Sequence, residues 1–324
     1  MTFFDAHLHI SPEFTGDRVL AFMDRTATDK AVLQAVYHTK AGPLAPEALR
    51  MKRAHPDRLR VFGAPDARLY FTAAERIGAA EIEYLKPLLD AGMDGIKLVE
   101  GKPQMRKMYP IPAFDSEAWE PFFAFLEENR IPLTWHVNDP AHFWSKDVSP
   151  WLIRQGWAYD ETFIHNETQY SEVLHVLERH KNLRAIFAHF FFMSDSLERL
   201  SGILDRYKEV RLDLTPGIEM YENFSAAPGS SAAFFEKYGD RILYGTDIGG
   251  RCILTNEGCP FNEKENLRRP EIVRYFLTGS EDRRICADGD YLIDREPFIM
   301  KPLALRGERL EKIAGKNLET VLAR

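Results

Sequence analysis

Two histidines near the start of the sequence, His7 and His9, are the first residues whose types and spacing could do chemistry. They lie in the mostly apolar run Phe3-Phe4-Asp5-Ala6-His7-Leu8-His9-Ile10, which favours a β-strand. Alternate side chains of a strand point to the same face, so the two imidazoles would aim at one point and could chelate a metal ion. Neutral histidine binds zinc, iron and similar ions. The alternative is two surface histidines on an edge strand, and further ligands elsewhere in the chain would decide between them.

Four more polar residues lie in, or at the end of, apolar runs that are typical of buried strands: Lys97, His136, His189 and Asp247. In a barrel of parallel strands, the carboxyl ends of all the strands meet at one face, and the active site lies there. Polar side chains at these ends would therefore converge with the first two histidines. Histidines buried for structural reasons would explain one or two of these positions, but not four histidines and an aspartate.

Runs rich in apolar and β-branched residues alternate with helical patterns over the whole chain. Eight such runs indicate strands: residues 3–10, 31–37, 60–65, 95–99, 131–137, 183–189, 210–214 and 241–247. Strands that alternate with helices predict a parallel α/β sheet, and eight of them predict a closed (β/α)8 TIM barrel. An open, doubly wound sheet is the alternative, but no G-x-G-x-x-G follows the first run. We expect a distorted barrel in one domain, residues 1–324, with an extra C-terminal helix over 303–322 that packs against its outside.

The composition is that of an ordinary globular protein and argues against several classes of function. The chain has 324 residues, of which 45% are hydrophobic and 28% charged, and a formal net charge of −7. This charge argues against general binding to nucleic acids or anionic membranes. No apolar run reaches the roughly 18–20 residues of a membrane helix, and the start lacks the pattern of a signal peptide. The three cysteines, Cys252, Cys259 and Cys286, lack zinc-ribbon spacing, so we expect free thiols and a cytoplasmic location.

Five motifs of the sequence occur together in one known family: Asp5-Ala6-His7-Leu8-His9, Gly95-Ile96-Lys97-Leu98, Trp135-His136, Ala188-His189 and Tyr244-Gly245-Thr246-Asp247. In type and order they resemble the amidohydrolase superfamily. The closer resemblance is to its amidohydrolase-related branch, which includes aminocarboxymuconate semialdehyde decarboxylase and resorcylate-type decarboxylases. It spans residues 3 to about 250, and a C-terminal segment, Lys312-Ile313-Ala314-Gly315-Lys316-Asn317-Leu318, is similar to the end of that branch.

The resemblance implies one divalent metal ion, most often zinc, with manganese or iron as alternatives. Its ligands would be His7, His9, His136 and Asp247, and His189 would lie beside it as a catalytic group. Three imidazoles and one carboxylate leave the ion a net positive charge and an open position for water, whose pKa falls toward about 7. Asp247 could take the proton of that water and deliver it to a leaving group, and His189 could stabilise charge on the substrate.

Lys97 has two interpretations. In binuclear relatives, a lysine on the corresponding strand is carbamylated and bridges two metal ions, which would imply a second ion here. The alternative is a free ammonium that binds a substrate carboxylate or pairs with Glu100 or Asp94. We favour the free ammonium, because the branch that the sequence resembles most is mononuclear.

Two long segments follow predicted strands and would lie at the active end of the barrel, residues 138–167 and 248–265. We expect substrate contacts from Asn138 and Trp144 in the first and from Arg251 in the second. The Arg251 guanidinium would suit a substrate carboxylate. Each residue has an alternative role: Asn138 as a turn former, Trp144 as part of the loop's own small core, and Arg251 in a salt bridge.

Two enzymatic functions share these residues. The one we favour is a metal-dependent hydrolase that opens a C–N or C–O bond in an amide, lactone or cyclic ester, with Asp247 as general acid and base. The other is a metal-dependent decarboxylase of an aromatic or unsaturated acid, which needs a dry pocket with aromatic walls, and Phe190-Phe191-Phe192 would suit it. A barrel that only binds ligands would leave the metal site idle. The expected partner is a small, carboxylate-bearing substrate, and homo-oligomers are common among proteins that resemble this one.

Overall fold

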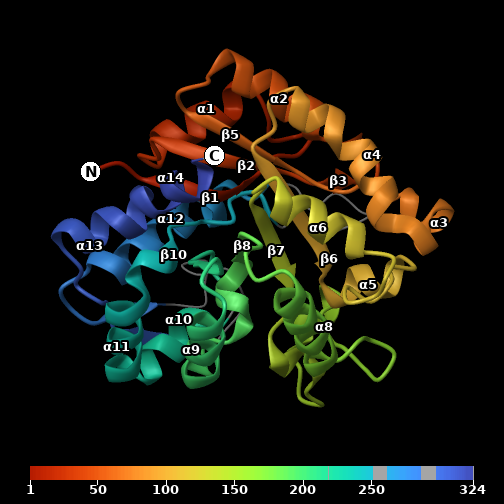
Figure 1. Ribbon diagram of the computed structural model, residues 1–324. Helices are drawn as coiled ribbons and strands as arrows, with labels where there is room; N and C mark the ends of the chain where they lie inside the picture. The colour runs from red at the N-terminus through yellow and green to blue at the C-terminus, as the bar shows by residue number, and fades with distance from the viewer. Residues whose placement is uncertain (218, 251–260, 286–296, 324) are drawn as a thin grey trace.

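Eight parallel strands form one sheet at the centre of the molecule, and helices surround them (Figure 1). The computed structural model describes residues 1–217, 219–250, 261–285 and 297–323. The order of the strands in the sheet follows the chain: β1 (Phe4–His9), β2 (Lys30–Ala35), β5 (Leu59–Gly63), β6 (Gly95–Gly101), β7 (Leu133–Val137), β8 (Ala185–Phe187), β9 (Arg211–Asp213) and β10 (Ile242–Leu243).

Backbone hydrogen bonds join β1 to the segment that follows β10. Ala6 N donates to Tyr244 O at 2.9 Å, and His9 N donates to Ile248 O at 2.8 Å. The other strands each pair in parallel with their neighbour along the chain. The sheet therefore nearly closes on itself, which confirms the predicted (β/α)8 TIM barrel.

Helices form the outer layer of the barrel (Figure 1). Their bounds are α1 (Asp17–Arg25), α2 (Ala45–Ala54), α3 (Leu69–Thr72), α4 (Ile77–Asp90), α5 (Pro103–Met108), α6 (Glu120–Glu128), α7 (Pro150–Arg154), α8 (Asn166–Arg179), α9 (Leu197–Arg206), α10 (Met220–Ala226), α11 (Pro228–Tyr238), α12 (Glu263–Thr278), α13 (Gly307–Glu311) and α14 (Asn317–Leu322). Two short antiparallel pairs complete the described structure: β3 (Tyr37–His38) with β4 (Gly42–Pro43), and β11 (Arg283–Ile285) with β12 (Phe298–Met300). Within the described ranges, no helix has the length and apolar character needed to cross a membrane.

The alternation of side chains along β7 shows how one strand serves both the core and the site. The ring of Trp135 packs outward and stacks on Phe123 of α6, with 5.1 Å between the ring centroids. Neighbouring residues of a strand point to the opposite face, so Thr134 and His136 point into the barrel. The outward residues therefore anchor the strand against a helix, while the inward ones are available for chemistry.

The C-terminal helix α14 covers one end of the barrel. Its residues Leu318 and Val321 pack in one cluster with Phe4 and Val32, which lie in the first halves of β1 and β2. This is the amino-terminal end of the barrel, opposite the strand ends that carry the predicted site. The extra C-terminal helix was expected against the outside of the barrel. In the structure, α14 instead covers the amino-terminal end of the barrel, where it shields the apolar interior residues from water.

We expect Leu318→Ala to lower the free energy of unfolding by about 2–5 kcal/mol, because it leaves a cavity in this cluster. A matched control is Glu319→Ala on the same helix, whose exposed carboxylate lies 3.0 Å from Lys30 Nζ. Loss of a surface ion pair should cost about 1 kcal/mol or less. Chemical denaturation measures both costs, and equal values would contradict a role for α14 in closing the barrel.

Candidate metal centre

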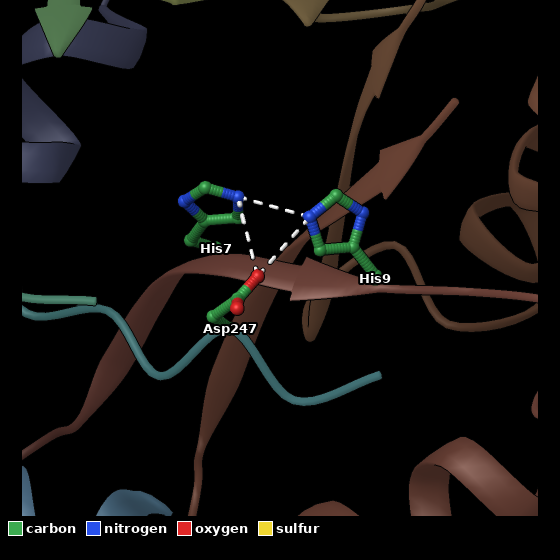
Figure 2. A group of neighbouring side chains, drawn as sticks. All are labelled: His7, His9 and Asp247. Atoms are coloured by element: carbon green, nitrogen blue, oxygen red, sulfur yellow. Dashed lines mark hydrogen bonds and ion pairs between the residues drawn. The ribbon is translucent and has the colours of Figure 1, made fainter. Parts of the chain in front are cut away.

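Two histidines of β1 and an aspartate that follows β10 meet at the carboxyl-terminal end of the barrel. His7 Nε2 lies 3.0 Å from His9 Nε2. Asp247 Oδ1 lies 3.3 Å from His9 Nε2 and 3.8 Å from His7 Nε2. The three side chains point toward one another (Figure 2). The structure therefore brings three of the four predicted metal ligands together, and we call them the triad.

The turn after β10 brings Asp247 close to β1 and requires glycine beside it. Asp247 itself has a φ of 55°, in the left-handed region. A Cβ on Gly250 would lie 2.1 Å from Asp247 Oδ1, and a Cβ on Gly249 would lie 2.7 Å from His9 O. A larger residue at either position would push the carboxylate or the strand away. The two glycines therefore permit the close approach that forms the triad.

A buried carboxylate behind His7 fixes the orientation of its ring. Asp213 Oδ2, at the end of β9, lies 2.8 Å from His7 Nδ1. Such a carboxylate holds the ring proton on Nδ1 and leaves the Nε2 lone pair for a cation. Asp213 Oδ1 accepts hydrogen bonds from the backbone N–H groups of His189, at 2.9 Å, and Thr215, at 3.2 Å. Asp213 was not among the predicted site residues, although its place near the end of the run 210–214 could have indicated it.

A buried arginine holds the other oxygen of Asp247. Arg269 of α12 is 3% exposed, and its Nη1 donates to Asp247 Oδ2 at 2.9 Å. Its Nη2 donates to Glu265 Oε1, also at 2.9 Å. Burial by itself would raise the pKa of Asp247, but the Arg269 guanidinium and His9 hold that pKa well below its usual range. The sequence carries no signal for Arg269, because it lies on a helix rather than at a strand end.

Lys97 of β6 reaches the same site. Its Nζ lies 2.8 Å from His7 Nε2, and the residue is buried. Burial lowers the pKa of Lys97 to about 8, although nearby carboxylates oppose this change. The alternative pairing with Asp94 is wrong, because the Asp94 carboxylate binds Lys52 Nζ at 2.7 Å. Among the described residues, no carboxylate lies within ion-pair distance of Lys97.

His136, at the end of β7, lies beside the triad but outside it. His136 Nε2 lies 2.9 Å from the backbone oxygen of Asn138 and 3.7 Å from Asp139 Oδ1. Asp139 in turn accepts a hydrogen bond from Lys102 Nζ at 2.5 Å. The rings of His136 and His189 are 5.0 Å apart between their centroids. A ligand role for His136 stays a prediction, because its Nε2 is bound to a carbonyl oxygen in this arrangement.

His189 stands on a strained turn directly after β8. Four consecutive residues have φ values in the left-handed region: His189 (54°), Phe190 (56°), Phe191 (59°) and Phe192 (50°). A left-handed conformation costs about 1–2 kcal/mol for each residue other than glycine. Such a turn persists only where the surrounding structure holds it in place.

Three consecutive phenylalanine rings hold this turn in three directions. Phe190 packs among aromatic rings of α10 and α11, and Phe191 stacks on a ring of β8 with 3.9 Å between centroids. Phe192 stacks on His189 itself at 5.0 Å. The Tyr170 hydroxyl of α8 donates to the backbone oxygen of Phe191 at 3.0 Å. The turn thus fixes the imidazole of His189 and places an apolar ring against it.

The four imidazoles of the site are neutral at neutral pH. Burial lowers the pKa of His136 to about 4 and that of His189 to about 3. Burial also lowers the pKa values of His7 and His9. His189 Nδ1 lies 3.3 Å from the backbone oxygen of Thr215, which favours a proton on Nδ1. Its Nε2 forms no hydrogen bond to a residue that the structure describes, so the lone pair there is available.

Asn138, one of the predicted substrate contacts, is occupied within the protein. Its side-chain amide is buried, donates to the backbone oxygen of Asn166 at 3.2 Å and accepts from Gln169 Nε2 at 2.7 Å. Its φ is 72°, a conformation that asparagine tolerates better than most residues. These contacts favour the alternative role of Asn138 as a turn former.

The other two predicted substrate contacts lie in the long loops. Trp144, in the turn Ala141–Trp144, packs edge-on against Tyr159 with 4.8 Å between centroids. In the same loop Trp151 packs against Trp157 at 5.5 Å. These contacts favour a small core within the loop itself. Arg251 and the three cysteines lie outside the described residues.

The donor atoms of the triad suit a divalent cation. Two ligands that each lie about 2.1 Å from a tetrahedral ion are about 3.4 Å from each other. The triad distances of 3.0, 3.3 and 3.8 Å bracket this value. His9 Nδ1 is also buried without a hydrogen-bond partner among the described residues, so the polar contacts of this ring lie on its Nε2 side, which faces the triad. Imidazole nitrogen and carboxylate oxygen are ligands that zinc, iron and manganese accept.

Comparison with known proteins identifies the family. A family profile described as amidohydrolase matches residues 4–317, nearly the whole chain. The chain belongs to the amidohydrolase family. The resemblance to this superfamily is thereby confirmed. A search of curated protein sequences found no match.

Solved structures with the same fold include a hydrolase and decarboxylases. A probable 2-pyrone-4,6-dicarboxylic acid hydrolase from Acinetobacter baumannii, with citric acid bound, is 13% identical over 85% of this chain and 93% of that one, with a TM-score of 0.51. A 2,6-dihydroxybenzoate decarboxylase from Rhizobium is 14% identical over 99% and 98%, with a TM-score of 0.56. A dihydroxybenzoic acid decarboxylase from Polaromonas sp. JS666, with bound manganese and the inhibitor 2-nitroresorcinol, is 14% identical over 99% and 96%, with a TM-score of 0.55.

Membership of this metal-dependent family makes the protein an enzyme of the hydrolase or decarboxylase type. The structural likenesses, all at low identity, show the fold alone. The choice between the two reactions therefore depends on the residues of the site itself.

We expect Asp213→Asn to weaken metal binding about 10–100-fold, because an amide no longer fixes the proton of His7 on Nδ1. Competition with a chromogenic chelator measures the affinity. A matched control is Glu172→Gln, which also removes a buried carboxylate but lies outside the site, where its partner is Arg106 at 2.8 Å. A folded Asp213→Asn protein with wild-type metal affinity would show that Asp213 does not orient the ligand.

We expect Tyr170→Phe to loosen the left-handed turn, because it removes the hydroxyl that binds the backbone oxygen of Phe191. Loss of this hydrogen bond should cost about 1 kcal/mol and shift the imidazole 15N resonances of His189. Tyr238→Phe is the control, since this tyrosine is equally buried as a residue and its hydroxyl donates to the Ser201 backbone oxygen at 3.1 Å, away from the turn. Identical His189 spectra in both variants would contradict the clamping role of Tyr170.

Proposed function

We propose that this protein is a metal-dependent hydrolase that opens a C–N or C–O bond in a small, carboxylate-bearing amide, lactone or cyclic ester. The observation that carries the proposal is the combination of the triad with an adjacent neutral imidazole. His189 offers an Nε2 lone pair with no hydrogen-bond partner among the described residues, and its ring centroid lies 5.8 Å from that of His7. A hydrolase needs such a proton acceptor beside its cation.

His7, His9 and Asp247 would hold one divalent ion, with His136 as the predicted fourth ligand. When bound, the ion polarises the substrate carbonyl and makes a water molecule more acidic. Asp213 and Arg269 keep the ligands in place, since Asp213 orients the His7 ring and Arg269 orients the Asp247 carboxylate. We propose zinc as the usual ion. Manganese is the alternative that the Polaromonas structure favours.

The proton of the attacking water goes to His189 rather than to Asp247 in this proposal. Asp247 Oδ2 is bound to Arg269, and Oδ1 faces the two histidines of the triad, so neither oxygen is free to accept a proton. His189 Nε2 is free, while its Nδ1 is held by the Thr215 backbone oxygen. His189 can therefore take the proton and return it to the leaving nitrogen or oxygen. We therefore propose His189 as the general acid and base, in place of Asp247, which the sequence suggested for this role.

A carboxylate on the substrate would find its counter-charge in Lys97. The Lys97 ammonium is buried beside the triad and has no ion-pair partner among the described carboxylates. An unpaired buried cation is costly, and an anionic substrate group removes that cost. This supports a substrate that carries a carboxylate next to the bond that breaks.

Decarboxylation is the second candidate, and one observation favours it. Phe192 stacks on His189 and lies 5.4 Å from the His136 ring, so one wall of the site is apolar and aromatic. Such a wall suits a flat unsaturated acid. Decarboxylation also needs a group that already carries a proton for the carbon left behind, and the low pKa values of Asp247 and His189 leave both without one at neutral pH. Among the described residues beside the triad, Lys97 is the one that carries such a proton, and hydrolysis is therefore our first choice.

We further propose that the enzyme works in the cytoplasm as one domain over residues 1–324. The location rests on three cysteines without the spacing of a zinc ribbon. The single domain is supported by a barrel and a family match that both run through nearly the whole chain.

The test combines metal analysis with a screen of lactones, amides and aromatic carboxylates. We expect about one equivalent of divalent metal in protein never exposed to a chelator, and product only from substrates with a hydrolysable bond. His7→Ala combined with His9→Ala should abolish both. Less than roughly half an equivalent of metal in wild-type protein would overturn the metal centre. Release of carbon dioxide from aromatic acids, without hydrolysis of any ester or amide, would establish the second candidate instead.

His189→Asn separates proton transfer from metal binding within the same test. We expect this variant to keep its metal and to lose about 10²–10⁴-fold in kcat, since that is the usual contribution of a general base. Asp247→Asn should lose metal as well as activity. Wild-type kcat in metal-loaded His189→Asn would show that another group moves the proton.

A further inference from the structure

A small pocket lies at the end of the barrel opposite the triad. Its volume is about 150 Å³, and three of its lining residues are arginines: Arg130, Arg184 and Arg211. Arg184 directly precedes β8, Arg211 begins β9, and Arg130 lies shortly before β7. The starts of neighbouring parallel strands lie at one edge of the sheet, so the fold brings the three guanidiniums together. Val321 of α14, the helix that covers this end, forms part of the wall.

The positive charge of this pocket is only partly balanced. Glu209 is the one acidic residue among those that line it. No ion pair joins Arg130, Arg184 or Arg211 to a carboxylate in the described parts of the chain, although arginines nearby on the surface are paired. Among the described lining residues, three guanidiniums and one carboxylate leave two net positive charges around a space of this size.

Two of the guanidiniums are anchored so that they cannot turn away from the pocket. Arg184 Nη1 donates to the backbone oxygens of Val321, at 3.2 Å, and Ala323, at 3.0 Å. Arg211 Nη1 donates to those of Lys208, at 2.9 Å, and Val210, at 3.2 Å. The second terminal nitrogen of each guanidinium forms no hydrogen bond to a described residue.

A fourth arginine at the same edge of the sheet, Arg241, differs from the three pocket arginines in the use of its donors. Arg241, just before β10, uses Nε and Nη2 for three bonds to the backbone oxygens of Leu204, Tyr207 and Val210. Arg241 is therefore a structural residue. The pocket arginines each keep donors that a ligand could use, and burial together with the neighbouring Arg130 guanidinium lowers the pKa of Arg184.

We propose that this pocket binds a small dianion, namely a phosphate group. Two net positive charges match a dianion, and the planar fork of a guanidinium fits two oxygens of one phosphate. The anchored donors of Arg184 and Arg211 would bind the phosphate oxygens, while Arg130 closes the pocket from the exposed side. This site lies at the far end of the barrel and does not depend on the proposed hydrolase activity.

The probe is inorganic phosphate, titrated by calorimetry into metal-loaded full-length protein at low ionic strength. We expect one saturable site and at least a tenfold loss of affinity in Arg184→Gln combined with Arg211→Gln. Arg53→Gln, which removes one exposed positive charge on α2, is the control and should bind as the wild type does. Acetate, a monoanion, should compete at least tenfold less well than sulfate.

Two further variants keep the test decisive if the double variant fails to fold. Arg130→Gln lies on the exposed rim and should weaken phosphate binding severalfold, while Glu209→Gln removes the one carboxylate among the described lining residues and should strengthen it. Unchanged affinity in both would overturn the proposal. Loss of binding in His7→Ala combined with His9→Ala would also overturn it, because the phosphate would then be bound at the metal centre. Retained binding in that variant supports the pocket.

Discussion

A single buried carboxylate, Asp213, connects the two parts of the site. One of its oxygens holds the proton of His7 on Nδ1, and the other accepts the backbone N–H of His189. The His7 ring and the backbone of His189 are thereby held by one residue, although they come from β1 and from the turn after β8. The barrel makes this connection geometrically simple, because the ends of its strands face the same space. Without the carboxylate, the His7 imidazole could adopt either tautomer, whereas the proton of His189 Nδ1 is held by the Thr215 backbone oxygen.

The histidines and the aspartate of the site differ in charge. Its four imidazoles are buried and neutral, whereas Asp247 is kept ionised by Arg269. Neutral nitrogen donors and one ionised oxygen donor are what a divalent cation requires, since protonated ligands cannot bind it. The guanidinium also limits Asp247 to one oxygen facing the triad. Arg269, on the outer helix α12, therefore determines which oxygen of Asp247 faces the triad.

Conformational strain is concentrated beside this centre. The left-handed turn from His189 to Phe192 is held by aromatic packing on three sides and by the hydroxyl of Tyr170. Strained backbone is common at functional sites, where the surrounding packing makes one geometry the only one available. Here the outcome is an imidazole with one nitrogen that has no hydrogen-bond partner among the described residues, and an aromatic ring against its face. The opposite end of the barrel, by contrast, holds arginines anchored by ordinary carbonyl contacts.

The sequence alone determined the barrel and the strand ends, because alternating apolar runs and helical periodicity are local patterns that survive without tertiary information. The same patterns placed His7, His9, His136, His189, Asp247 and Lys97 at one face. Only the tertiary structure could decide which of these converge, because a distance depends on how strands pair and how turns bend. It placed His136 against the Asn138 carbonyl, tied Asp94 to Lys52 and bound Asn138 within its own loop. The structure also showed the contact between Arg269 and Asp247. These residues are 22 positions apart in the chain, so no local sequence pattern indicates the contact.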